Sequence, residues 1–198
     1  MLESLRGARI GFAVCGSFCT FEKAFASARE LISLGCELTP IMSFNAASLN
    51  TRFGKASEHR SLFEGISGRP LIATIEDAEP IGPKKPFDLM IVAPCTGNTL
   101  AKLALAITDT PVTMAVKAHM RNQRPTLIAL ATNDALSGSA KNLGMLQNVR
   151  GYFFVPFEQD DPAGKPASLV SLFDRLPEAA ALALQGKQLQ PMYGGGAL

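Results

Sequence analysis

Short apolar runs that alternate with segments of helical period constrain the fold of this chain more than any other feature. Residues 10–15 are almost wholly apolar, as expected of a central strand that is covered on both faces. After the break at Gly16, the apolar residues Phe21, Phe25 and Ile32 recur at helical spacing and form one stripe. This alternation is typical of βαβ units and predicts an α/β fold built on a parallel sheet.

The same pattern continues along the chain. Thr20 is expected to cap the first helix and Gly35 to end it. Further strands are predicted at residues 36–44, 87–93, 126–131 and 152–155. Further helices are predicted around residues 58–66, 74–78, 100–107, 112–119, 135–147 and 169–184, with a loop at residues 156–166. We expect a single domain over residues 1–190 and a frayed tail over residues 191–198.

Composition and charge argue against several classes of protein. The formal net charge of +2 is small and the basic residues are scattered, so no nucleic-acid partner is expected. No stretch approaches the roughly 20 apolar residues of a membrane span, and the first residues lack the apolar core of a signal peptide. The 4 cysteines include no CxxC pair, which favours reduced thiols over a metal site. A cytoplasmic protein without a bound metal is therefore expected.

Three predicted strand ends share one chemical character. Residues 16–20 follow the first strand, residues 43–48 follow the second, and residues 94–99 follow the strand at 87–93. All three segments are uncharged and rich in small or hydroxyl-bearing residues. Because ligands of open parallel sheets bind beyond the carboxyl ends of the strands, we expect these three loops to form one site.

The composition of these loops favours a phosphate ligand. Such a loop leaves the first backbone N–H groups of the following helix unpaired, and these donors suit an anion. Gly16 and Gly97 allow close approach of the backbone, while Ser17, Thr96 and Thr99 add hydroxyl groups. No GxxxxGK[ST] motif occurs, which argues against a Walker-type loop.

A single loop of this kind is explained more simply by helix caps and turns, but three at one sheet edge favour a phosphate site. The predicted cofactor-binding residues are Gly16, Ser17, Phe18, Thr20, Ser43, Phe44, Asn45, Pro94, Thr96, Gly97, Asn98 and Thr99.

With these loops in view, the chain resembles the flavoprotein superfamily of cysteine decarboxylases and flavin prenyltransferases. Their corresponding loop reads Pro-Ala-Ser-Ala-Asn-Thr followed by Ala-Lys, and residues 94–102 here read Pro-Cys-Thr-Gly-Asn-Thr-Leu-Ala-Lys. More closely, almost the whole chain is similar to the family of dipicolinate synthase B subunits from spore-forming bacteria. The segments that carry this likeness are residues 9–12, 16–17, 43–45, 50–54, 93–98, 121–122, 131–136 and 156–162.

The resemblance implies a flavodoxin-like Rossmann fold, a three-layer sandwich with a central parallel sheet. It also implies a role in sporulation, in which a small diacid, a hydroxylated tetrahydrodipicolinate, loses water and is oxidised to dipicolinate. The implied cofactors are FMN on this chain and NADP on a partner, the A subunit of dipicolinate synthase. The absence of a GxGxxG motif from this chain agrees with that division. Relatives with these loops commonly form trimers or larger shells, so a homo-oligomer is expected.

One position departs from the decarboxylase pattern. In those enzymes a catalytic histidine lies eight residues before the aspartate that opens the strand, and counting back from Asp88 gives Pro80. Because proline cannot transfer protons, we do not predict decarboxylation of a peptidyl cysteine, and no catalytic residue is assigned. Two alternatives stay open: an FMN- or phosphate-binding scaffold subunit without chemistry of its own, and a flavin-dependent decarboxylase-like enzyme.

Further polar residues are candidate substrate-binding residues, each with a second interpretation. Arg52 could bind an acidic substrate or contact another copy of the chain. Either Arg121 or Arg124, which lie close to His119 near a predicted helix end, could grip a dianion or complement the helix dipole. Asn133 could contact a ligand or, together with Asp134, cap the next helix.

Overall fold

The computed structural model describes residues 2–194, and its centre is a sheet of seven strands that are mostly parallel. The strands are β1 (Arg9–Val14), β2 (Glu37–Met42), β3 (Leu89–Cys95), β4 (Thr126–Thr132), β5 (Tyr152–Phe154), β6 (Phe157–Glu158) and β7 (Leu169–Ser171). The order is β2-β1-β3-β4-β7-β6, and β5 also pairs with β4. Strands β1 to β5 pair in parallel, whereas β7 pairs antiparallel with both β4 and β6.

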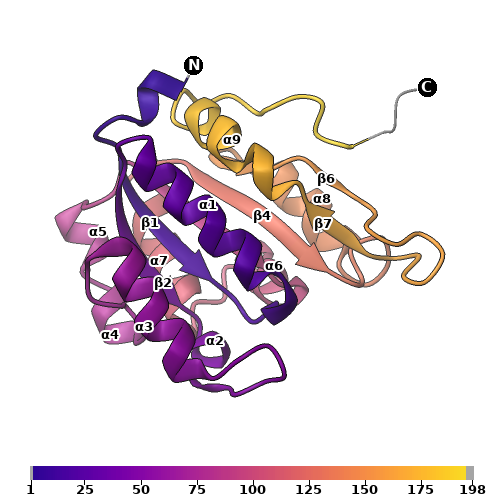
Figure 1. Ribbon diagram of the computed structural model, residues 1–198. Coiled ribbons are helices and arrows are strands. Elements are labelled where there is room, and N and C mark those ends of the chain that lie inside the picture. The colour runs from indigo at the N-terminus through magenta and orange to yellow at the C-terminus, as the bar shows by residue number, and fades with distance from the viewer. Residues whose placement is uncertain (1, 195–198) are drawn as a thin grey trace.

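Helices cover both faces of this sheet. They are α1 (Phe21–Ser33), α2 (Phe44–Ser48), α3 (Ala56–Ser67), α4 (Ile75–Ala78), α5 (Ile81–Lys84), α6 (Gly97–Ala104), α7 (Pro111–Met120), α8 (Ala140–Gln147) and α9 (Leu176–Ala183). Figure 1 shows α1 and α9 in front of the sheet and α6 and α7 behind it. The predicted three-layer α/β sandwich is therefore confirmed.

Two cores, one on each face, explain the continuous apolar run of β1. Ile10, Phe12 and Val14 point into the core shared with α1 and α9, whereas Ala13 points into the core shared with α6 and α7. Successive side chains of a strand point to opposite faces, so a strand that is covered on both sides has no position for a polar residue.

The largest difference from the predicted elements lies at residues 169–184. We predicted one helix, but β7 comes first, a 3-10 turn follows at Phe173–Arg175, and α9 begins only at Leu176. The reason is long-range pairing, because β5 covers only the first half of β4 and leaves Ala131 and Thr132 free to pair with β7. The predicted loop at residues 156–166 contains the short strand β6 for the same reason.

Several boundaries also differ. The predicted strand at residues 36–44 stops at Met42, because Ser43 caps the short helix α2. The predicted helix at residues 135–147 starts only at Ala140, after a series of turns. Thr20 stands at the start of α1 as predicted, but its hydroxyl makes no capping bond and donates to the Ser17 carbonyl at 2.8 Å.

The predicted tail lies only partly within the described residues. Met192 and Tyr193 lie against β6, since the Met192 carbonyl accepts from the Phe157 amide at 3.1 Å and the Tyr193 ring contacts the Phe157 ring. This part of the tail is therefore packed rather than frayed, and residues 195–198 fall outside the described residues. Among the described residues, no helix combines the length and the apolar character needed to cross a membrane.

Candidate functional site

The loops that follow β1, β3 and β4 line one cavity of about 610 Å³. In Figure 1 the arrows of β1 and β4 point towards the same side of the molecule, which places their loops at one edge of the sheet. Of the predicted cofactor-binding residues, those that line this cavity are Gly16, Ser17, Thr20, Thr96, Gly97 and Asn98. Asn133, a predicted substrate-binding residue, lines it as well.

Three residues that line this carboxyl-edge cavity have unpaired backbone amides. Within residues 2–194, the N–H groups of Gly16, Gly97 and Asn98 donate no hydrogen bond. Gly97 and Asn98 open helix α6, so the positive end of that helix dipole faces the cavity. The amide of Ser17 is already bonded to the Cys15 carbonyl at 2.8 Å, so this residue has only its hydroxyl to offer.

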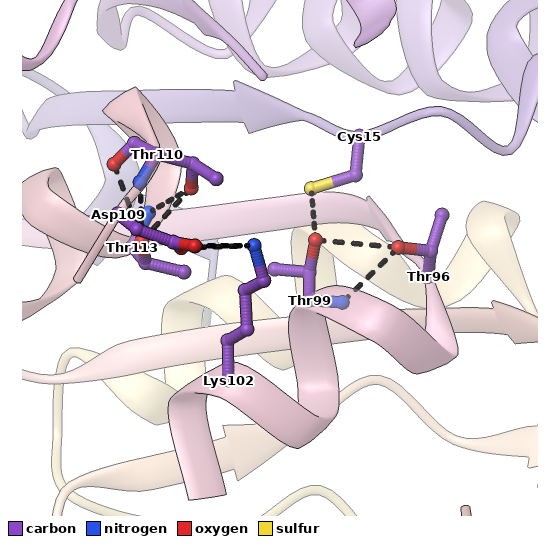
Figure 2. Close-up of polar contacts among 7 residues, drawn as sticks. All are labelled: Cys15, Thr96, Thr99, Lys102, Asp109, Thr110 and Thr113. Atoms are coloured by element: carbon purple, nitrogen blue, oxygen red, sulfur yellow. Dashed lines mark hydrogen bonds and ion pairs between the residues drawn. The ribbon is translucent and has the colours of Figure 1, made fainter. Parts of the chain in front are cut away.

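A chain of short polar contacts holds the start of α6 (Figure 2). The Thr96 hydroxyl accepts a hydrogen bond from the Thr99 amide at 3.3 Å and donates one to the Thr99 hydroxyl at 3.2 Å. The Thr99 hydroxyl in turn donates to the Cys15 sulfur at 3.3 Å. Burial raises the pKa of the Cys15 thiol to about 11, so this thiol stays protonated at neutral pH. Thr99 and Cys15 therefore position the loop, and neither is a reactive group.

The loop after α6 is fixed by a separate set of contacts. Lys102 pairs with Asp109 at 2.8 Å, and the Thr110 hydroxyl caps α7 by accepting from the Thr113 amide at 3.1 Å (Figure 2). The ion pair lowers the pKa of Asp109, chiefly through the hydrogen bond from Lys102.

Gly97 is required by a close approach between two loops of the protein. A Cβ atom there would lie 2.7 Å from the Ser139 hydroxyl and 2.8 Å from both the Asp134 carboxylate and the Thr132 hydroxyl. The Asp134 carboxylate accepts from Thr132 at 2.6 Å and from Ser139 at 2.9 Å, so it organises the turn after β4. Asp134 thus acts on this turn, and its side chain does not cap α8.

Two lysines supply the charge that the loops lack. Lys23, on α1, lines the cavity and forms no ion pair with any described residue. Lys165 reaches the cavity from the segment between β6 and β7, where it pairs with Asp160 at 2.9 Å. Hydrogen bonds from Ser168 and Lys165 lower the pKa of Asp160, which therefore stays ionised at neutral pH.

The predicted second loop lies beside the cavity rather than on its wall. Ser43 is buried and caps α2, and Phe44 is exposed, with 45% of its surface accessible. Asn45 is next to the first loop, because a Cβ atom on Gly16 would be 3.6 Å from the Asn45 Cβ. The expectation that all three loops line one cavity was therefore wrong for this loop.

Three other predicted cofactor-binding residues do not line the cavity but pack next to the loops that do. Phe18 packs on Phe21, with ring centroids 5.0 Å apart, Pro94 is buried in β3, and Thr99 is buried beneath the start of α6.

Arg52 and Arg121 do not reach the cavity. Arg52 lies in the exposed turn between α2 and α3, with its guanidinium 4.8 Å from the centroid of the Phe53 ring. Arg121 follows α7 and precedes β4, so it lies at the amino edge of the sheet, whereas the cavity lies at the carboxyl edge. Its neighbour His119 is not a surface cation, because burial lowers its pKa to about 4.

Sequence reasoning missed the cavity residues that come from distant elements. Lys23 lies in a helix whose visible signal is its apolar stripe, and Asp160 has the sequence context of an ordinary turn residue. Lys165 and Val170 come from the segment whose pairing with β4 is not visible in the sequence. Within the described residues, no group of three or more His, Cys, Asp or Glu side chains could hold a metal ion.

Comparisons with known proteins agree with this architecture. A family model described as Flavoprotein matches residues 1–179. The B subunit of dipicolinate synthase from Bacillus subtilis (strain 168) is 47% identical over 191 residues, which are 96% of this chain and 96% of that protein.

Solved structures show the same relationship. The crystal structure of the dipicolinate synthase B subunit from Bacillus halodurans matches with a TM-score of 0.88 at 38% identity, covering 96% of this chain and 98% of that one. The FMN-dependent cysteine decarboxylase SpaF matches with a TM-score of 0.69 at 22% identity, covering 91% and 99%. The likeness to SpaF is one of fold. This chain belongs to the flavoprotein family and is a homologue of the dipicolinate synthase B subunit.

Proposed function

We propose that this chain is the B subunit of a dipicolinate synthase, which acts during sporulation on a hydroxylated tetrahydrodipicolinate. The observation that carries the proposal is the 47% identity that extends over 96% of both this chain and its Bacillus subtilis relative. A match of that extent includes the strand-end loops and the elements that position them.

The donors of the carboxyl-edge cavity fit the phosphate group of FMN. Free amides at Gly16, Gly97 and Asn98 and the hydroxyl of Ser17 surround one space, and Lys23 adds a cation. The Thr96 hydroxyl bonds to Thr99 and holds the loop that presents these amides. Phosphates in proteins are commonly held by such helix N-termini, glycine-rich turns and hydroxyls. FMN supplies two-electron redox chemistry when it is bound.

The conversion requires the loss of one water and the removal of one hydride and one proton from the ring. NADP⁺ on the A subunit is the proposed acceptor of the hydride, which balances the oxidation. On this chain, Lys23 and Lys165 are placed to attract a substrate with two carboxylates, and Asn133 offers an amide for orientation. The proposed site of action is the cytoplasm.

We also propose that the chain self-associates. Leu105 and Ile107, in the loop after α6, are 60% and 42% exposed, and Met145 on α8 is 46% exposed. Exposed large apolar side chains in adjacent loops and helices are typical of surfaces that are covered in an oligomer. Light scattering on the purified chain would test this.

The test is reconstitution from purified parts. This chain, the A subunit, NADP⁺ and the hydroxylated precursor are mixed, and the ultraviolet spectrum of dipicolinate is followed. The expected result is rapid product formation with both proteins and little with the A subunit by itself. Equal rates with and without this chain would contradict a catalytic role.

A second candidate is a scaffold that binds a flavin or phosphate without chemistry of its own. This candidate is favoured because both acidic side chains on the cavity wall already have hydrogen-bond partners within the protein. Asp134 accepts from two hydroxyls, and Asp160 accepts from Lys165 and Ser168. Asn98→Ala should weaken FMN binding under either hypothesis. Only an enzyme predicts that some substitution, such as Asp160→Asn, abolishes turnover while FMN binding survives.

A third candidate, a decarboxylase-like enzyme, is weaker. Pro80, at the position of the catalytic histidine in the resembling family, directly precedes α5 and has no side-chain proton to transfer. Release of carbon dioxide from a cysteine-ending peptide by the FMN-loaded chain would revive it.

A further inference from the structure

A second cavity lies at the amino edge of the sheet, and its wall differs in charge and polarity from that of the carboxyl-edge cavity. Its volume is about 600 Å³, and it lies between the end of α7, the turns that precede β4 and β5, and the end of α9. This is the opposite edge of the sheet from the carboxyl-edge cavity, so the two have no lining residue in common.

Arginine supplies all the charge on the wall of this amino-edge cavity. Arg124 and Arg150 line it, and no carboxylate of the described residues does. Arg150 makes no ion pair or hydrogen bond with any residue in the range 2–194, so its guanidinium is available. The nearest carboxylate that the contacts reveal is Asp88, which already pairs with Arg9 at 2.7 Å and with Arg124 at 3.3 Å.

Arg124 is held in place rather than free. One terminal nitrogen of its guanidinium donates to the carbonyls of Lys85 and Phe87 and to the Asp88 carboxylate. The other nitrogens have no partner among the described residues, and 29% of the side chain is exposed. A cation that is anchored at one end presents its remaining donors with little loss of conformational entropy on binding.

Three residues on the same wall also have unpaired backbone amides. The amides of Arg124, Arg150 and Gly151 donate no hydrogen bond within the described part of the chain. Turns with such free amides, next to guanidinium groups, favour an anion over a neutral ligand.

Apart from Gln123 and the two arginines, the side chains on the wall are apolar. Met120, Phe153 and Leu184 line the cavity and are only partly buried by the protein. A simple inorganic anion would leave these surfaces exposed to water, whereas an anion with an apolar or aromatic body would cover them.

We propose that the amino-edge cavity binds a small organic anion, of the aromatic carboxylate class, between Arg124 and Arg150 with its ring against Phe153. The proposal is independent of the function proposed above, because it involves none of the residues at the carboxyl edge.

The test is calorimetric titration of the full chain with benzoate at low, fixed ionic strength. One equivalent should bind per chain, and neutral benzamide should give no saturable heat. Arg150→Gln should weaken binding roughly tenfold or more, the loss expected for one charge-assisted hydrogen-bonding group. Arg150 is exposed and unpaired within the described chain, so this variant is expected to fold, and its thermal unfolding is measured alongside.

Lys187→Gln is the matched control, since Lys187 is an exposed cation next to Gly186, which lines the cavity, but is not itself on the wall. It should bind like the wild type, and so should Thr96→Ala at the other edge. Unchanged binding in Arg150→Gln, equal weakening in Lys187→Gln, or absence of binding by the wild type would each overturn the proposal. Equally tight binding of inorganic phosphate would overturn the requirement for an apolar body.

Discussion

The two edges of the sheet carry cavities of nearly equal volume, about 610 and about 600 Å³, but they are built from different chemistry. At the carboxyl edge, backbone amides and hydroxyls face the cavity, and Lys165 is partly neutralised by Asp160. At the amino edge, two guanidinium groups face the cavity, and no carboxylate of the described residues lies on the wall.

The difference shows that the two edges of a parallel sheet offer different hydrogen-bond donors to a ligand. At the carboxyl edge the chain leaves each strand and enters a helix, so free amides arise from the backbone itself. At the amino edge the chain leaves a helix and enters a strand, so carbonyls predominate and cations must come from side chains. Arg124, which donates to the carbonyls of Lys85 and Phe87, follows this rule.

The largest expected effect is a pH dependence at the amino edge. Burial lowers the pKa of His119 from its ordinary 6.5 to about 4, with Arg124 contributing and the Pro125 carbonyl opposing. As the pH falls from 6.5 towards 4, His119 becomes protonated in the unfolded chain but stays neutral in the folded chain. The free energy of unfolding should therefore fall by about 3 kcal/mol over that range.

His119→Gln, which keeps a donor for the Pro125 carbonyl, should flatten this slope. Denaturant unfolding across the pH range measures it, and an equally steep slope in the variant would sink the assignment to His119.

The next effect concerns the close approach at the carboxyl edge. Gly97→Ala places a methyl group within 2.8 Å of the Thr132, Asp134 and Ser139 side chains, so it should destabilise the fold by about 1–3 kcal/mol and abolish FMN binding. Gly144→Ala is the matched control, because nothing lies within 4 Å of a Cβ there. That change, inside helix α8, should stabilise the chain by up to about 1 kcal/mol. A neutral Gly97→Ala would show that the two loops separate easily.

A third prediction separates capping from ligand binding. Thr96 caps α6 at the cavity and Thr110 caps α7 away from it, each through its hydroxyl. Replacing either threonine by alanine should lower the free energy of unfolding by about 1 kcal/mol. Only Thr96→Ala should also weaken FMN binding in a flavin-absorbance titration. Equal FMN affinity in the two variants would remove Thr96 from the proposed site.

The smallest effect is a difference between two ion-paired carboxylates, Asp88 at the amino edge and Asp109. Asp88 is 34% exposed and pairs with two arginines, so Asp88→Asn should reduce stability by less than about 1 kcal/mol at neutral pH. Its pKa is lowered, chiefly by the hydrogen bond from Arg9, so this contribution disappears as the pH falls through that lowered pKa. Asp109→Asn removes a carboxylate that is more exposed and pairs with one lysine, so it should change stability less. The reverse order in thermal unfolding would contradict the ranking.

Much of the carboxyl-edge site could be predicted from the sequence, because its main parts are local. Buried strands end just before Gly16 and Ser17 and directly before residues 96–98. The rule that strand ends hold ligands identifies these residues without knowledge of the fold. Ser43 and Asn45 satisfy the same rule, but they form the start of the short helix α2 and do not line the cavity. The rule thus predicts the edge of the sheet correctly, but it does not predict which side chains reach the cavity.

The amino-edge cavity could not be predicted in the same way. Arg124 and Arg150 are separated by β4 and α8 in the chain, and they meet only because β5 lies beside β4. In the sequence Arg124 is one of two candidate anion-binding arginines near a helix end. Arg150 is a single basic residue with no pattern that distinguishes it from a solvated surface charge.

The α/β layering, the buried strands and the hydroxyl-rich loops follow from the amino-acid order alone, because they depend on hydrophobic period and on residues next to one another in the chain. Three features needed the folded molecule: the pairing of β7 with β4, the meeting of Lys23 and Lys165 with the loops, and the two arginines on one wall. Long-range pairing is selected by the complementarity of whole surfaces, and no local segment of the chain contains such a surface.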